Sequence, residues 1–100
     1  MNLTVDSTPD HGGWILSLKG ELDLATVPCI QEVFDSWLIV PSHLIIDARG
    51  VSFIDSTGLG VLIRAWKLVG GRFSLRHPSH QTMRLLELSG LADTIEIEHS

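Results

Sequence analysis

Asp55, Ser56 and Thr57 place three oxygen-bearing side chains in succession, where an apolar run gives way to a helical pattern. Each of these residue types can accept a hydrogen bond from an unpaired N–H group of a first helical turn, so we expect a helix to begin here. Partial positive charge collects at that end of a helix. The hydroxyl of Ser56 could therefore cap the helix or, beside a suitable base, act as a nucleophile.

The residues that follow predict a helix packed against a core. Gly58 and Gly60 leave the joint free of bulky side chains, and Gly70 and Gly71 predict the helix end. Between them the apolar residues recur at the helical spacing i, i+3, i+4, i+7. These residues are Leu59, Leu62, Ile63, Trp66 and Val69.

Apolar residues on the opposite side of this helix predict a docking surface. If Thr57 points outward, a rotation of about 100° per residue places Gly60, Val61, Arg64 and Leu68 near it. A solvated helix face is normally polar, yet Val61 and Leu68 are apolar. We therefore expect a partner protein to contact this face, beside Ser56 and Thr57.

Catalytic motifs are incomplete in this chain. Asp55 to Gly58 is one residue longer than the Asp-Ser/Thr-Gly loop of aspartic proteases, and there is no second copy. Gly-x-Ser-x-Gly is absent, and the sequence places no histidine beside Ser56. Gly58-x-Gly60 lacks the third glycine of a dinucleotide loop, and His77 and His80 lack partner ligands for a metal. We expect no enzyme activity, no cofactor and no metal site.

Four segments carry a resemblance to a known family. Residues 53–60 read Phe-Ile-Asp-Ser-Thr-Gly-Leu-Gly, preceded by Gly-Glu-Leu-Asp at 20–23 and Leu-Ile-Ile-Asp at 44–47 and followed by Leu-Ser-Gly-Leu at 88–91. This pattern resembles the STAS domain family of bacterial anti-sigma factor antagonists. The resemblance covers essentially the whole chain, in the order and spacing expected of the family. It implies one STAS domain spanning residues 1–100.

The resemblance implies a switch based on phosphorylation of Ser56. In the unphosphorylated state such a protein binds an anti-sigma factor that is also a serine kinase, and a sigma factor is released for transcription. A metal-dependent serine phosphatase resets the switch, and the protein is cytoplasmic. In the family the matching aspartates lie near the serine, so the resemblance assigns Asp23, Asp55 and Asp47 to the surface that the kinase meets.

The expected partner-binding residues combine the helix face with the family pattern. They are Asp23, Asp55, Ser56, Thr57, Gly58, Gly60, Val61, Arg64 and Leu68. Two other functions stay open. The chain could be a STAS subunit of a lipid-transport or other transporter complex that docks on its ATPase without phosphorylation. It could also be a small serine hydrolase, which a reactive-serine probe would detect.

Composition indicates a small folded domain. The chain has 100 residues, 44% hydrophobic and 19% charged, with a net charge of −5. It has no Lys/Arg cluster, which argues against nucleic acid or an anionic membrane as the partner. No apolar run is long enough to span a bilayer, and Cys29, the one cysteine, cannot form an internal disulfide.

The order of elements predicts an α/β fold, β-β-α-β-α-β-α-β. Two strands joined by the turn at residues 9–13 should form an antiparallel hairpin, and right-handed crossovers should follow. Residues 44–46 are continuously apolar, which predicts a central strand covered on both faces. The result is a mixed sheet with helices packed on it. The expected strands lie at residues 3–5, 14–18, 44–46, 72–76 and 94–98, and the helices begin at Thr26, near Ser56 and at Ser79.

Overall fold

The computed structural model describes residues 2–99, so Met1 and Ser100, the two ends of the expected domain 1–100, lie outside the described part. The element order β-β-α-β-α-β-α-β is as predicted. The strands are β1 (Leu3–Asp10), β2 (Gly13–Leu22), β3 (Leu44–Ile54), β4 (Phe73–Arg76) and β5 (Glu96–Glu98). The helices are α1 (Val27–Asp35), α2 (Ser56–Leu68) and α3 (His80–Leu88).

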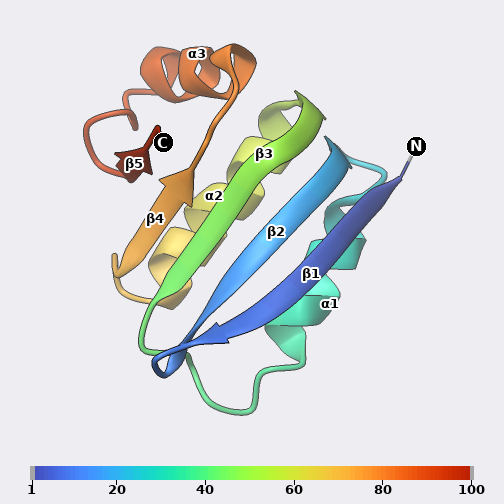
Figure 1. The fold of residues 1–100 in the computed structure, drawn as a ribbon. Coiled ribbons are helices and arrows are strands. Elements are labelled where there is room, and N and C mark those ends of the chain that lie inside the picture. Colours follow the sequence, from blue (N-terminus) through green and yellow to red (C-terminus); the bar gives the residue numbers. More distant parts are fainter. Residues whose placement is uncertain (1, 100) are drawn as a thin grey trace.

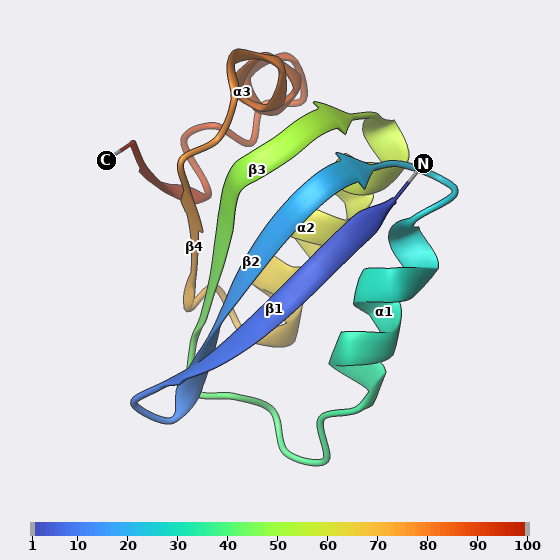
Figure 2. The same cartoon turned by 45° about the vertical axis from the view of Figure 1, so that its right-hand side comes forward.

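The strands form one mixed sheet in the order β1-β2-β3-β4-β5. β1 pairs antiparallel with β2 as a hairpin, and the other neighbouring strands pair in parallel. Figure 1 shows α1 and α2 side by side behind the sheet, and no described helix crosses its front face in Figure 1 or Figure 2. The predicted mixed α/β sheet is confirmed, with the crossover helices α1 and α2 on one side.

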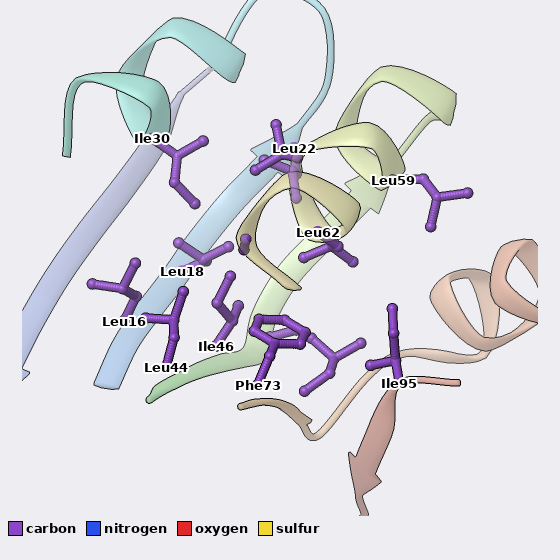
Figure 3. Packing of buried hydrophobic residues seen from close by; sticks show 14 of the residues in the cluster. Leu16, Leu18, Leu22, Ile30, Leu44, Ile46, Leu59, Leu62, Phe73 and Ile95 are labelled. Carbon is purple, nitrogen blue, oxygen red and sulfur yellow. The ribbon is translucent and has the colours of Figure 1, made fainter. Parts of the chain in front are cut away.

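The core lies between the sheet and these two helices. Alternate residues of the central strands point into it, where Leu16 and Leu18 of β2 meet Leu44 and Ile46 of β3 (Figure 3), all at most 2% exposed. Ile45 points the other way and is only partly buried. The expectation that residues 44–46 are covered on both faces was therefore wrong. α1 and α2 lie on the same face of the central strands, so Ile45 on the other face has no helix over it.

β2 and β3 are longer than the sequence predicted. Gly20 does not end β2, which continues to Leu22, because shifts of register absorb the irregularity between Ser17 and Glu21. Gly20 has φ of +116°, and a Cβ there would lie 2.0 Å from the carbonyl oxygen of Asn2, so only glycine fits. The longer strands pair up to Leu22 and Ile54 and so end together.

The face of α2 that carries Val61 is buried, contrary to expectation. Val61 is 0% exposed, whereas Leu68 is 37% exposed and Arg64 is exposed, as predicted. The sequence prediction assumed that only one side of α2 packs against other elements. In the structure α1 packs beside α2, so the side of α2 turned toward its neighbour is buried as well as the side turned toward the sheet. Val61 is a core residue and therefore cannot be part of the predicted docking surface.

We predict that Val61→Asp destabilises the domain strongly and that Leu68→Asp has little effect on its stability. An aspartate at 61 would bury a charge without a partner, and we expect the domain to lose its cooperative thermal unfolding. An aspartate at 68 meets water, so the melting temperature should stay within a few degrees of the wild-type value. Circular dichroism melts of both variants make the comparison. A folded Val61→Asp domain would contradict the burial of this residue.

Candidate functional site

The ends of β2 and β3 bring the predicted site together. Leu22 pairs with Ile54 at the end of the parallel ladder, and the N–H of Asp55 donates to the carbonyl oxygen of Leu22 at 3.3 Å. The β2–α1 loop therefore lies beside the first turn of α2. Residues more than thirty positions apart in sequence meet at the C-terminal ends of β2 and β3. In α/β folds, binding sites commonly lie at the C-terminal ends of parallel strands.

Asp55 is the N-cap of α2. One carboxylate oxygen accepts from the N–H of Gly58 at 2.9 Å, and the other accepts from the N–H of Leu24 at 3.4 Å. The Gly58 N–H is the main reason that the pKa of Asp55 lies below its usual value, with further help from Thr57 and Leu24. Its ionised carboxylate thus ties the helix start to the β2–α1 loop.

Ser56 is exposed at the first position of α2, and Thr57 is partly exposed beside it. Asp55 already makes the capping hydrogen bond, so neither hydroxyl is needed for that purpose. The N-terminus of α2 stabilises negative charge nearby. The structure therefore presents Ser56 to solvent where a negatively charged group can be accommodated, next to an ionised carboxylate.

Asp23 lies in the same loop but shapes the backbone. Its side chain is 6% exposed, and one carboxylate oxygen accepts from the N–H groups of Ala25 and Thr26, both at 3.1 Å. The hydroxyl of Thr26 donates to the carbonyl oxygen of Glu21 and does not cap α1. Asp23 thus holds the loop in the shape that places Leu24 beside Asp55.

Asp47 does not reach this site. The family resemblance placed Asp47, with Asp23 and Asp55, on the surface around Ser56. Asp47 instead lies within β3, seven residues before its end, and its carboxylate accepts from the N–H of Arg49 at 3.0 Å. At about 3.3 Å per residue that separates it from Ile54 by roughly 23 Å. The expectation was wrong because β3 is much longer than its apolar run at 44–46 indicated.

The sequence did not predict two exposed apolar residues near the start of α2. Leu24 is 72% exposed and Phe53 is 41% exposed. Together with Asp23, Ala25 and Asp55 they line a shallow cleft of about 320 Å³. Each belongs to a stretch that alternates or runs apolar, so sequence alone could not separate them from core residues. We call Leu24, Phe53, Asp55 and Ser56 the switch patch.

Arg64 and Leu68 lie farther along α2. At 1.5 Å per residue they are roughly 12 and 18 Å from Ser56 along the helix axis. They border a groove of about 360 Å³ between the C-terminal halves of α1 and α2. The predicted docking surface therefore has two parts, the switch patch and this groove, with Gly60 between them.

Residues 2–99 show no histidine base beside Ser56, no metal-binding cluster and no membrane-spanning helix. No described histidine hydrogen-bonds to Ser56, and His43 instead contacts Asp10 at 2.9 Å and Ser42 at 3.2 Å. No group of three or more His, Cys, Asp or Glu side chains in this range could hold a metal ion. None of the helices described has the length and apolarity required of a membrane-crossing segment.

The fold and this site define a small α/β domain that exposes a serine at a helix N-terminus. The model of the STAS domain family matches residues 2–100. The chain therefore belongs to the STAS domain family, as the sequence resemblance indicated.

Similar proteins carry anti-sigma antagonist names. The anti-sigma-B factor antagonist of Bacillus subtilis is 33% identical over 100 residues, covering 97% of this chain and 92% of that protein. The crystal structure of an anti-sigma factor antagonist from Mycobacterium paratuberculosis matches with a TM-score of 0.85 at 26% identity, covering 99% of this chain and 87% of that one. Unphosphorylated SpoIIAA shares the fold, with a TM-score of 0.79 at 22% identity over 94% of this chain and 87% of that one.

We predict that the two glycines of the first turns of α2 respond oppositely to alanine. A Cβ at Gly58 would lie 2.2 Å from the carbonyl oxygen of Leu22, so Gly58→Ala should disrupt the joint and lower stability. A Cβ at Gly60 has no atom within 4 Å, so Gly60→Ala should raise stability by up to about 1 kcal/mol through helix propensity. Urea unfolding at equal protein concentration measures both. A neutral Gly58→Ala would contradict the close approach of α2 to β2.

Removing the Asp55 cap should weaken the fold. We expect Asp55→Ala to cost about 1 kcal/mol and lower the melting temperature by roughly 4–8 °C. Because folding lowers the pKa of Asp55 from 3.8, its ionised form adds stability above that value, and this is lost as pH falls through the lower folded-state pKa. Asp55→Asn keeps a capping oxygen but does not titrate, so its stability should vary less with pH below about pH 4. Melts from neutral to acid pH compare the three proteins.

Proposed function

We propose that this protein is an anti-sigma factor antagonist that works as a phosphorylation-controlled binding switch. With Ser56 unphosphorylated it binds an anti-sigma factor that is also a serine kinase, and a sigma factor is freed for transcription. The observation that carries the proposal is the exposed Ser56 at the start of α2, where Asp55 makes the cap in its place. Next to it, exposed Leu24 and Phe53 line a cleft together with Asp55. The names of the similar proteins support it.

The proposed partner surface is centred on the switch patch. Leu24 and Phe53 supply apolar contact area, and Thr57 and Gly60 extend it along α2. Asp23 acts through the shape of the loop, and Gly58 allows the close packing that fixes the joint. Arg64 and Leu68 form its outer edge. The kinase would transfer phosphate from ATP to Ser56, a metal-dependent serine phosphatase would remove it, and both would act in the cytoplasm.

Within the domain, phosphorylation meets two opposing forces of similar size. The N-terminus of α2 attracts a phosphate by about 0.3–2 kcal/mol. The Asp55 carboxylate repels it, by roughly 3 kcal/mol per pair of unit charges at about 5 Å and an effective dielectric constant near 20, and by less where water screens the pair. We therefore expect the isolated fold to change little. The effect arises at the interface, where docking would strip water from a charge of about −1.5 to −2.

We predict that phosphorylation of Ser56 weakens binding of the cognate anti-sigma factor at least about tenfold, equal to about 1.4 kcal/mol. Ser56→Asp should weaken binding in the same direction but less, since it carries one charge and lies on a shorter side chain. Ser56→Ala should bind as the unphosphorylated protein does and should resist the kinase. Isothermal titration calorimetry with the purified anti-sigma factor measures the affinities, and thermal melts report folding.

Thr57→Ala is the matched control, because it removes the neighbouring hydroxyl but should leave phosphorylation at position 56 intact. Mass spectrometry of the protein from its native cells should find phosphate on Ser56. Equal affinities of the two forms would reject the switch. That result would favour a STAS subunit of a lipid-transport or other transporter complex, which docks on its ATPase without phosphorylation.

The proposed function is binding and not catalysis, as in the regulatory proteins that it resembles. A serine nucleophile needs a base in hydrogen-bond reach, and Ser56 has none among the described side chains. We expect a fluorophosphonate probe to leave Ser56 unlabelled in the folded protein. Stoichiometric labelling, abolished by Ser56→Ala, would instead identify a hydrolase.

A further inference from the structure

The segment between α1 and β3 exposes three apolar side chains in a row. Leu38 is 99% exposed, Ile39 is 85% exposed and Val40 is 53% exposed. Figures 1 and 2 show this segment beyond the C-terminal ends of α1 and α2, at the pole opposite the start of α2. We call Leu38, Ile39 and Val40 the apolar tip. The tip is remote from the switch patch, so the proposed switch does not account for it.

Both ends of the segment are held by the fold. Trp37 stacks on Trp14 with ring centroids 6.5 Å apart and planes 7° from parallel. On the other side, the N–H of Ser42 donates to the carbonyl oxygen of Gly12 at 3.0 Å, and the guanidinium of Arg72 donates to the Ser42 carbonyl. The tip is therefore displayed from an anchored base. Contiguous apolar groups displayed in this way mark interaction sites.

A complementary groove lies next to the tip. Phe34 of α1 and Leu68 of α2 supply its apolar part, within a volume of about 360 Å³. Arg64 and Lys67 line it from α2, and Asp35 lines it from the end of α1. The segment that carries the tip begins directly after α1. One end of the molecule thus offers both an apolar projection and an apolar recess with charges of both signs.

We propose that two copies of this chain associate through this end about a twofold axis. The tip of each copy occupies the α1–α2 groove of the other. Because tip and groove are adjacent, a single axis makes both contacts at once, and each contact is formed twice. The acidic Asp35 at the base of one tip then faces the basic Arg64 and Lys67 of the other groove.

Area and charge favour a second copy over the other occupants. Three side chains alone bury too little surface for a stable interface. In the twofold arrangement each tip and each groove contributes twice, which brings the buried area closer to the roughly 1,200 Å² that specific complexes bury. An anionic membrane would repel a chain of net charge −5, and residues 36–42 contain no Lys or Arg to offset this. We expect a weak dimer, with a Kd in roughly the micromolar range.

Self-association would also bear on the switch, a consequence that rests on the proposed function. Leu68 and Arg64 belong both to this dimer and to the outer edge of the proposed partner surface. A dimer would therefore cover part of that surface while Ser56, about 12 Å from Arg64 and about 18 Å from Leu68 along α2, stays accessible to a kinase. Anti-sigma factor binding and dimer formation would compete.

Sedimentation equilibrium of the pure protein tests the dimer, from about 1 µM to about 1 mM. We expect a monomer–dimer equilibrium that Ile39→Asp weakens at least about tenfold. Leu24→Asp is the control, since Leu24 is similarly exposed but lies at the opposite pole, and it should leave the equilibrium unchanged. Lys67→Asp should weaken the dimer by placing an acid near the partner's acidic tip base. The double variant Asp35→Lys with Lys67→Asp should restore it.

Circular dichroism melts confirm that each variant is folded, which keeps loss of association separate from loss of structure. A monomer throughout the concentration range would overturn the proposal. A dimer that ignores Ile39→Asp would overturn it too, because another surface would then be responsible. Co-sedimentation of a monomeric chain with phosphatidylcholine vesicles, abolished by Ile39→Asp, would assign the tip to a lipid surface instead. None of these outcomes depends on whether Ser56 is phosphorylated.

Discussion

The carboxylate of Asp55 is the interaction on which the functional end of this molecule depends. It accepts from the N–H of Gly58 inside α2 and from the N–H of Leu24 in a loop that follows a different strand. One ionised group thus caps the helix and fixes the loop against it. Since Asp55 makes the cap, Ser56 is left exposed, and the same contact sets an apolar side chain, Leu24, beside it.

The placement of α1 and α2 on one face of the sheet decides which residues of α2 are exposed. α2 packs against α1 on one side and against the sheet on another. Val61 is therefore buried, whereas Leu68 at the C-terminal end of α2 is exposed. The front face of the sheet is left to alternating, partly exposed residues such as Ile45. The apolar side chains that stay exposed therefore lie at the ends of the helices and in the loops beside them.

The two poles of the domain differ in chemistry. At one pole an exposed serine lies among carboxylates and a few apolar groups, and under the proposed function its affinity for a partner would change when charge is added. At the other pole an uncharged segment presents apolar side chains from an anchored base. Charge added at the first pole is screened over about 8–10 Å, so it would have little direct electrostatic effect on the second pole. A small domain can in this way combine a switchable surface with a constant one.

The sequence by itself determined the order of the elements, the joint at residues 55–57, Ser79 as a cap of α3 and the STAS family, because helix starts and apolar periodicity are local properties. Only the tertiary structure decided that Val61 is buried, that Asp47 lies far from Asp55, and that Leu24 and Phe53 are exposed beside Ser56. A periodic pattern marks which side of a helix is apolar but not how many neighbours cover it. Strand length and exposure depend on pairing partners more than thirty residues away, and no local window contains that information.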